Sequence, residues 1–322
     1  MDIRTAFKKG IAQLREADVH SFTLAAELLL LDVLGRNRTW LYAHPEEIVS
    51  DAELQRFFEL IARRAAGEPT QHLTGKQEFW GLEFEVTPDV LIPRPETEHV
   101  IEVALDRLAL RELRAGRPQK SAGEGLRIAD VGTGSGCIAI ALAKELPAAN
   151  FIATDISPAA LAVAQRNAQR HGVADRIVFR EANLFAAVGA RQAAPQLGTM
   201  PNSAPPSALH QTRTTSHQSP LFDLIASNPP YIGRREADSL AREVRDHEPD
   251  AALFGGEEGY ELYADLITQS AAHLKPGGIL VLELGHNSLP AVRPLFDSPH
   301  WINVGVANDL AGILRVISAQ RT

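Results

Sequence analysis

Residues 126–146 read LRIADVGTGSGCIAIALAKEL, and this stretch decides the fold. The apolar run that ends at Val131 predicts a buried strand, and residues 137–146 predict a helix. Between them, glycines at alternate positions let the backbone turn tightly and let a ligand approach without interference from Cβ atoms. A strand, a glycine loop and a helix in this order are typical of the first unit of an α/β fold that binds a ligand at the loop.

The same alternation of strands and helices continues along the chain. It predicts a parallel, doubly wound α/β sheet of the Rossmann-like kind. The last two strands are too close together for a helix between them, so one of them is expected to run antiparallel. Strands are predicted at 150–156, 176–185, 222–228, 278–285, 301–309 and 312–320, and helices at 158–172, 261–274 and 289–296.

Residues 1–74 have a different pattern, which predicts a small bundle of three amphipathic helices. Ser21 and Asp51 are plausible N-caps for the second and third helices, and Gly35 and Gly67 are plausible ends. Residues 75–95 predict a β-hairpin around Gly81 that links this domain to the α/β domain, residues 96–322.

Composition narrows the class of function. The chain has 322 residues, enough for two domains, and its net charge of −8 argues against a protein that grips nucleic acid through phosphates. Its longest apolar run is interrupted by Glu27 and Asp32, so no membrane span is expected. The single cysteine, Cys137, and an N-terminus without a secretory pattern favour the cytoplasm. Histidines lack the spacing of metal ligands, so no metal is expected.

Residues 186–220 are rich in Ala, Pro, Ser, Gln and Thr and contain no acidic residue. Such a segment cannot bury enough apolar surface to offset its chain entropy, so a disordered insertion is predicted there. A partner-binding role for this segment is the alternative.

The glycine loop and a strand-end carboxylate together indicate a cofactor. Asp155 ends the second sheet strand, 19 residues after Gly136, where a carboxylate can accept both hydroxyls of an adenosyl ribose. A dinucleotide fingerprint would place its third glycine at position 137, so S-adenosylmethionine (SAM) fits better than NAD. The expected cofactor-binding residues are Asp130, Gly132, Thr133, Gly134, Ser135, Gly136, Asp155, Asn183, Leu184 and Asn228.

A second loop, Ser227-Asn228-Pro229-Pro230-Tyr231, is predicted at the tip of the strand beside the cofactor. The two prolines have no N–H, so with the Asn228 carboxamide oxygen the loop offers hydrogen-bond acceptors. Acceptors suit a planar NH₂ group, on which Tyr231 could stack. Catalysis would then rest on positioning and preorganised electrostatics. Asn228, Pro229 and Tyr231 are the expected catalytic residues; a merely rigid turn is the alternative.

With these motifs, the chain resembles the release-factor glutamine N5-methyltransferases (PrmC/HemK type) over nearly its whole length. The resemblance implies SAM-dependent methylation of the glutamine amide in the Gly-Gly-Gln motif of class-1 peptide release factors. It implies that the helical domain docks the release factor, and that Asn228, Pro229, Pro230, Tyr231, Arg94, Glu96 and Thr97 bind the substrate. The resemblance rests on GEPTQHLTGKQEFWGLEFEV, VLIPRPETE, DVGTGSGCIAIALA, ASNPPYI, EPDAALFGGEEGYELY and LKPGGILVLELG.

Two features depart from that family. Asn183 stands where the family often has Asp, and Leu184 where an aromatic residue can follow, which predicts weakened or altered SAM affinity. The 186–220 insertion is longer than the family usually carries and is expected near the cofactor side. The alternatives are a glutamine methyltransferase acting on a ribosomal protein, an N6-adenine DNA methyltransferase, and a SAM-fold binding protein without activity. The Pro93–Glu98 loop argues against the ribosomal-protein methyltransferase, and the acidic net charge argues against the DNA methyltransferase. An intact Asn228 argues against a binding protein without activity.

Overall fold

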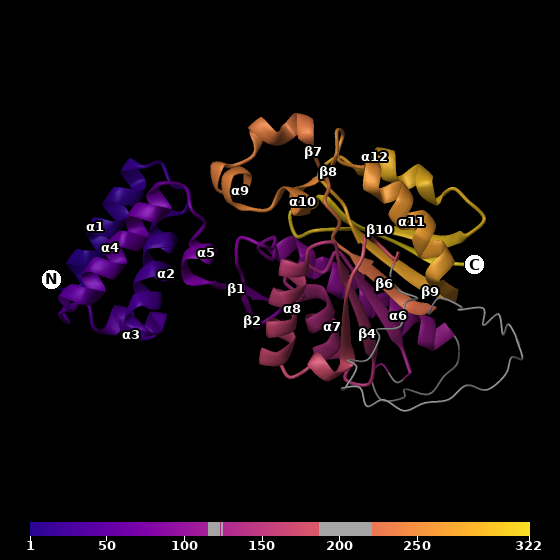
Figure 1. Ribbon diagram of the computed structural model, residues 1–322, viewed down its shortest axis with the longest axis horizontal. Coiled ribbons are helices and arrows are strands. Elements are labelled where there is room, and N and C mark those ends of the chain that lie inside the picture. Colours follow the sequence, from indigo (N-terminus) through magenta and orange to yellow (C-terminus); the bar gives the residue numbers. More distant parts are fainter. Residues whose placement is uncertain (115–122, 124, 187–220) are drawn as a thin grey trace, which may run out of the picture.

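A seven-stranded sheet forms the centre of the protein (Figure 1). The computed structural model describes residues 1–114, 123, 125–186 and 221–322, and orders the strands β10-β11-β9-β6-β3-β4-β5. In chain order they are β3 (Arg127–Val131), β4 (Asn150–Asp155), β5 (Ile177–Glu181), β6 (Phe222–Ser227), β9 (Leu274–Glu283), β10 (Trp301–Asn308) and β11 (Leu314–Arg321).

The strand directions confirm the predicted doubly wound sheet. β3 pairs in parallel with β4 and β6, β4 with β5, and β6 with β9. β11 pairs antiparallel with both β9 and β10, so it is the strand of this sheet that runs against the others. The strand order reverses between β3 and β6. Their carboxyl ends therefore flank the switch point, where open α/β sheets bind their ligands.

Helices cover both faces of the sheet. α6 (Glu98–Arg114), α7 (Cys137–Glu145) and α8 (Pro158–Arg170) pack on one face. α11 (Glu261–His273), α12 (Leu289–Val292) and the 3-10 turn Arg293–Phe296 pack on the other. α6 was not predicted from the sequence. Within the described ranges no helix is long and apolar enough to cross a bilayer.

The N-terminal helices have their own apolar core and form a separate lobe in Figure 1. A helical bundle was predicted, but with three helices rather than five, because two short helices join the long ones. The five are α1 (Ile3–Glu16), α2 (Phe22–Leu34), α3 (Arg38–Ala43), α4 (Asp51–Ala65) and α5 (Thr70–Thr74).

The helix ends correct several of the predicted caps. Ser50, not Asp51, caps α4, and it does so in a capping box with Glu53. Ser21 occupies the N-cap position of α2, but its backbone is left-handed (φ 54°) and its side chain makes no capping hydrogen bond. Gly35 ends α2 in a left-handed conformation as predicted, whereas the C-cap of α4 is Ala66.

A β-hairpin around Gly81 is confirmed, formed by β1 (Lys76–Phe79) and β2 (Leu82–Glu85). Trp80 and Gly81 both have positive φ, which matches the twist of a tight hairpin turn. The turn is fixed to the α/β domain because the Trp80 backbone N–H donates to Glu98 over 2.7 Å and its indole N–H donates to Glu145 over 2.8 Å.

A segment between β6 and α11 that the sequence did not reveal joins the two domains. It contains β7 (Ile232–Gly233), a 3-10 turn (Arg234–Ser239), α9 (Arg242–His247), α10 (Asp250–Leu253) and β8 (Phe254–Gly256). β7 and β8 pair in parallel, and α9 is the part of the segment nearest the N-terminal lobe (Figure 1). The buried Arg64 of α4 forms an ion pair with Glu243 of α9.

The structure differs from the prediction at two strand ends, and a third prediction falls almost wholly outside the described residues. The third sheet strand ends at Glu181, so Asn183 and Leu184 lie in the following loop and not in the strand. β9 begins at Leu274 and not at residue 278, so it includes Lys275-Pro276-Gly277-Gly278, whereas the helix before it ends at His273, within one residue of the predicted end. The predicted disordered insertion, 186–220, lies outside the described residues except for Ala186.

Candidate active site

The glycine loop between β3 and α7 needs glycine for two different reasons. Gly132, Gly134 and Gly136 have φ values of 72°, 53° and 85°, which other residues rarely adopt. A Cβ on Gly132 or Gly134 would meet no atom within 4 Å, so these positions leave the backbone open to a ligand. A Cβ on Gly136 would lie 3.3 Å from the Ala164 Cα, so this glycine allows α7 to pack closely on α8.

Two neighbouring residues of β4 hold the loop in place. The backbone N–H groups of Gly132 and Thr133 both donate to the Thr154 carbonyl over 2.8 Å. The Gly134 N–H donates to Asp155 Oδ2 and the Ser157 N–H to Asp155 Oδ1, each over 2.9 Å. These bonds fix the orientation of the Asp155 carboxylate at the end of the strand.

Asp130 supports the loop from below. Its carboxyl is fully buried, and its Oδ2 accepts hydrogen bonds from the Thr133 hydroxyl (2.6 Å) and the Ala139 N–H (3.1 Å). Burial raises the pKa of Asp130 to about 7. Asp130 is not among the residues that line the pocket described below. Its hydrogen bonds show that it holds the shape of the glycine loop.

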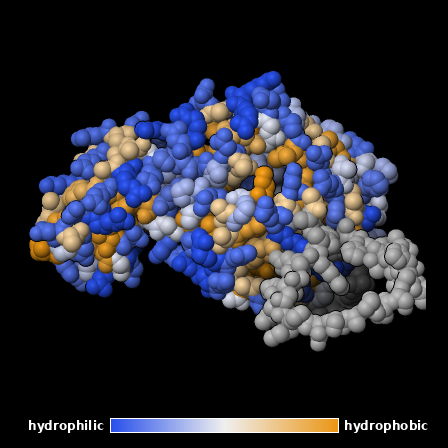
Figure 2. Space-filling view, in the orientation of Figure 1, coloured by the Kyte–Doolittle hydropathy of each residue, from blue (hydrophilic) through white to orange (hydrophobic). Residues whose placement is uncertain are grey.

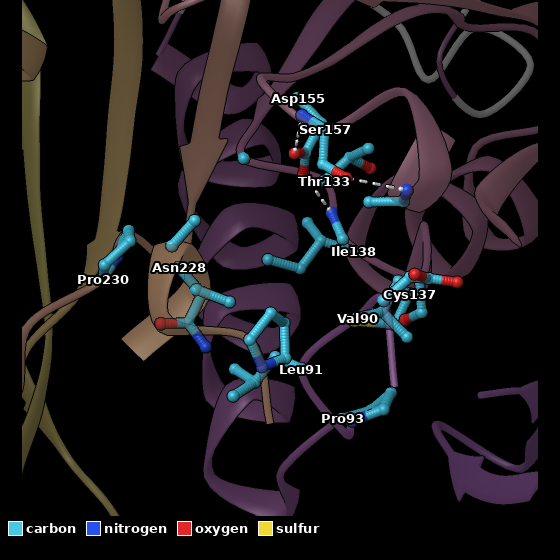
Figure 3. Close-up of a pocket in the computed structure, with 18 of the residues that line it drawn as sticks. Val90, Leu91, Pro93, Thr133, Cys137, Ile138, Asp155, Ser157, Asn228 and Pro230 are labelled. Atoms are coloured by element: carbon cyan, nitrogen blue, oxygen red, sulfur yellow. Dashed lines mark hydrogen bonds between the residues drawn. The ribbon is translucent and has the colours of Figure 1, made fainter. Parts of the chain in front are cut away.

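A pocket opens beside this loop, and the glycine loop, Asp155 and Asn228 all lie on its wall. In Figure 3, Asp155 and Ser157 lie at one end, Asn228 and Pro230 at the other, and Ile138 between them. Its wall includes Asp89, Val90, Leu91, Pro93, Ile138, Ile156, Ser157, Ala160, Pro249, Ala251 and Ala252.

The Asn-Pro-Pro-Tyr loop follows β6 directly and reaches this pocket. Asn228 and Pro230 line it, whereas Pro229 is buried behind them. The Tyr231 hydroxyl donates to Glu283 Oε1 over 3.2 Å. Burial raises the pKa of Tyr231, so the phenol keeps its proton at neutral pH.

Three glycines that the sequence did not single out shape this loop. A Cβ on Gly255 would overlap the Pro230 carbonyl oxygen, and one on Gly259 would overlap the Tyr231 carbonyl oxygen. A Cβ on Gly285 would lie 2.9 Å from the Tyr231 ring. The glycines of the EPDAALFGGEEG and LELG motifs therefore allow close packing around residues 230 and 231.

The segment 91–94 lies across the pocket and is tied down by Glu248. This buried glutamate accepts a hydrogen bond from the Ile92 N–H over 3.1 Å and forms an ion pair with Arg94. Arg94 was expected to bind the substrate; it does line the pocket, but its guanidinium is paired with Glu248.

The structure brings most of the predicted site residues together. The predicted residues that line the pocket are Arg94, Thr97, Gly132, Thr133, Gly134, Ser135, Asp155, Asn228 and Pro230. Pro229 and Tyr231 lie behind its wall, and Glu96 is exposed. Asn183 and Leu184 do not line the pocket: Asn183 is exposed, and Leu184 packs against the apolar cluster on the α11 face.

Glu283 is the site residue that sequence reasoning missed most plainly. It ends β9, is fully buried, and contacts the Tyr231 hydroxyl. The available signal was a glutamate inside the apolar run GILVLELG, since a charged residue is seldom fully buried without a partner.

Cys137 also lies on the pocket wall, at the start of α7. Burial raises the pKa of its thiol to about 12, so it remains protonated at neutral pH. It is therefore poorly suited to act as a nucleophile.

The sheet order, the glycine loop and the strand-end Asp155 define the class of the protein as methyltransferase. Residues 122–192 match the family model described as a methyltransferase domain, and residues 5–75 match the PrmC N-terminal domain. Among solved structures, the hMettl16 catalytic domain is similar in fold, with a TM-score of 0.50, 16% identity, and coverage of 80% of this chain and 81% of that one.

Curated relatives identify the family. A release factor glutamine methyltransferase of Koribacter versatilis is 41% identical over 100% of this chain and 99% of its own length. Another from Nitratidesulfovibrio vulgaris is 39% identical over 96% of this chain and 92% of its own. The chain therefore belongs to the release factor glutamine methyltransferase family.

Proposed function

We propose that this protein uses SAM to methylate the side-chain nitrogen of the glutamine in the Gly-Gly-Gln motif of class-1 peptide release factors. The observation that carries the proposal is the position of Asn228: its carboxamide lines the same pocket as the glycine loop and Asp155. The cavity thus offers acceptors for an NH₂ group beside a site for the methyl donor.

The pocket residues fit SAM. The open backbone at Gly132 and Gly134 allows close approach, and the Asp155 carboxylate is held at the pocket wall, where it can accept ribose hydroxyls. Val90, Ile138 and Ile156 supply an apolar wall suited to a purine ring. When bound, SAM supplies an electrophilic methyl group.

The chain's own residues position the glutamine amide. The Asn228 carboxamide oxygen would accept one N–H of the amide. The backbone carbonyl oxygen of Pro229, whose ring is buried behind the pocket wall, would accept the other, and Tyr231 would support this loop from behind. An amide nitrogen is a poor nucleophile because its lone pair is delocalised. Holding both N–H bonds on acceptors raises its electron density and aims it into the pocket. The nitrogen becomes acidic only as it gains the methyl group, so no strong base is required.

The N-terminal lobe, residues 1–74, is proposed to dock the release factor, with 75–95 as the link to the catalytic domain. Figure 2 shows apolar surface among the charged side chains of this lobe, and Leu24, Leu28 and Ile48 are among its exposed large apolar residues. Patches of this kind often mark sites of protein interaction.

Transfer of tritiated methyl from SAM tests the proposal. We expect label on a purified class-1 release factor, and none on the same factor with its motif glutamine replaced by alanine. Label on a ribosomal protein or on DNA, with the release factor unlabelled, would overturn the assignment.

A further inference from the structure

A carboxamide has two chemically different ends, and only one suits the role of Asn228. To hold a substrate NH₂ group, its Oδ1 must face the substrate, while its Nδ2 must be bound elsewhere. If the side chain turned by 180°, it would present a donor to a donor. Something in the protein must therefore fix which end points inward.

Thr97 binds the nitrogen end. Asn228 Nδ2 donates to the Thr97 Oγ1 over 3.0 Å, and Thr97 is buried, with 2% of its surface exposed. Thr97 belongs to the 3-10 turn Pro95–Thr97 just before α6. A hydroxyl can also donate, however, so this contact fixes the carboxamide only if the hydroxyl hydrogen is directed elsewhere.

Glu283 supplies that second constraint. Its carboxylate is fully buried, and the Thr97 hydroxyl is close enough to it to favour its charged form. Its buried Oε2 has no hydrogen-bond partner among the residues that the structure describes, whereas its Oε1 accepts from Tyr231. An ionised carboxylate only accepts hydrogen bonds, so a rotatable hydroxyl beside it donates to it.

We propose that Glu283 and Thr97 are positioning residues that fix the orientation of Asn228 through a one-way chain of hydrogen bonds. The Asn228 N–H donates to Thr97, the Thr97 O–H donates to Glu283, and the Asn228 Oδ1 is left facing the substrate. The Tyr231 hydroxyl occupies the other Glu283 oxygen, so the same carboxylate anchors both functional side chains of the loop. This inference rests on the proposed function.

The chain of hydrogen bonds requires the ionised carboxylate, so it is complete only above about pH 7, the pH near which Glu283 ionises. Burial raises the pKa of Glu283 to about 7, while Thr97, Tyr231 and the nearby Arg315 oppose that rise and Glu96 adds to it. The Tyr263 hydroxyl donates to the backbone carbonyl of Glu283 and not to its side chain.

Kinetics of three threonine variants test the chain of hydrogen bonds. Thr97→Val removes the hydroxyl at nearly constant volume, and we expect kcat to fall about 10- to 100-fold, as for other residues that orient a functional group. The Kd for SAM should change by less than about threefold, since Thr97 does not touch the glycine loop or Asp155 in the contacts described. Thr97→Ser restores the hydroxyl and should recover most of kcat. Thr268→Val, the same change on α11 and away from the pocket, is the control and should leave kcat unchanged.

A double-mutant cycle separates positioning from a general structural effect. If Thr97 acts through Asn228, the Asn228→Ala/Thr97→Val variant should be no slower than Asn228→Ala alone. If each substitution instead lowered kcat independently, so that the two fold-losses multiplied in the double variant, the proposal would be overturned. Glu283→Gln should lower kcat in the same way, because a glutamine can present a donor to Thr97; full activity of this variant would also overturn it.

A measurement without the protein substrate keeps this inference distinct from the proposed function. The side-chain NH₂ resonance of Asn228, assigned by its loss in Asn228→Ala, should shift and exchange faster in Thr97→Val but not in Thr97→Ser. An unchanged resonance in Thr97→Val would overturn the hydrogen-bond chain. If this resonance responds as expected but wild-type protein labels no release factor, the proposed function fails and the inferred chain stands.

Discussion

The two halves of the pocket are built in different ways. The half around Gly132 and Asp155 owes its shape to contiguous sequence, namely one glycine loop, its positive φ angles and hydrogen bonds to the adjacent strand. The half around Asn228 owes its shape to distant residues, because Thr97 lies 131 positions earlier and Gly255 and Gly285 pack against the loop from later elements. Changes in the two halves should therefore affect binding of the methyl donor and turnover differently.

The largest effect is expected for Asn228→Ala. It removes a preorganised acceptor that acts on the reacting amide, a type of change that costs about 10²- to 10³-fold in kcat. The Kd for SAM, measured by calorimetry, should change much less, since the glycine loop and Asp155 remain. Normal turnover in this variant would contradict the amide-holding role.

The second largest effect is expected in the pH dependence of the free energy of unfolding, through Glu283. The pKa of Glu283 is raised to about 7 in the fold from a usual 4.5, so the unfolded chain releases this proton at lower pH than the folded one. Its contribution to stability is thus fully present below about pH 4.5 and is lost as pH rises to about 7, a change on the order of 3 kcal/mol.

The matched variant Glu283→Gln lacks this titration. Relative to it, the wild-type free energy of unfolding should fall between pH 4.5 and pH 8, which denaturant titrations at several pH values would reveal. Parallel curves for the two proteins would show that Glu283 does not titrate abnormally.

Gly255→Ala should lower both stability and turnover. The added methyl group overlaps the Pro230 carbonyl oxygen, and overpacking of this kind costs about 1–3 kcal/mol. Gly172→Ala is the control, because its methyl group meets no atom within 4 Å and its cost is limited to the positive φ, on the order of 1 kcal/mol. A Gly255→Ala variant as stable and active as Gly172→Ala would argue against tight packing behind the loop.

The smallest effect is expected for Gly132→Ala. The new Cβ meets no protein atom, but the residue must hold φ near 72°, which costs on the order of 1 kcal/mol. The methyl group also projects into space proposed for SAM. The Kd for SAM should therefore rise more than in Asn228→Ala, the reverse of the order expected for kcat; the opposite ranking would remove the contrast between the two halves.

The two halves of the pocket also differ in how far they could be predicted from the sequence. The strand–loop–helix unit around Gly134 was predictable because local periodicity and glycine spacing determine it. Asn228 was predictable because the two prolines that follow it have no N–H group, so this loop offers hydrogen-bond acceptors. Glu283 and Gly255 were not, since their roles depend on which strands become neighbours and on how closely two backbones approach. The segment Arg234–Leu253 was missed because it is made of short elements without clear periodicity.

The hydrogen bond between the Ile92 N–H and Glu248 joins residues 156 positions apart in the chain. Closing a contact between residues so far apart in the chain costs conformational entropy, which other contacts of the folded domain must offset. The glycine loop depends mainly on β3, β4 and the helix between them. The proposed substrate side of the pocket therefore depends on long-range contacts of the complete fold, whereas the proposed cofactor side depends mainly on local ones.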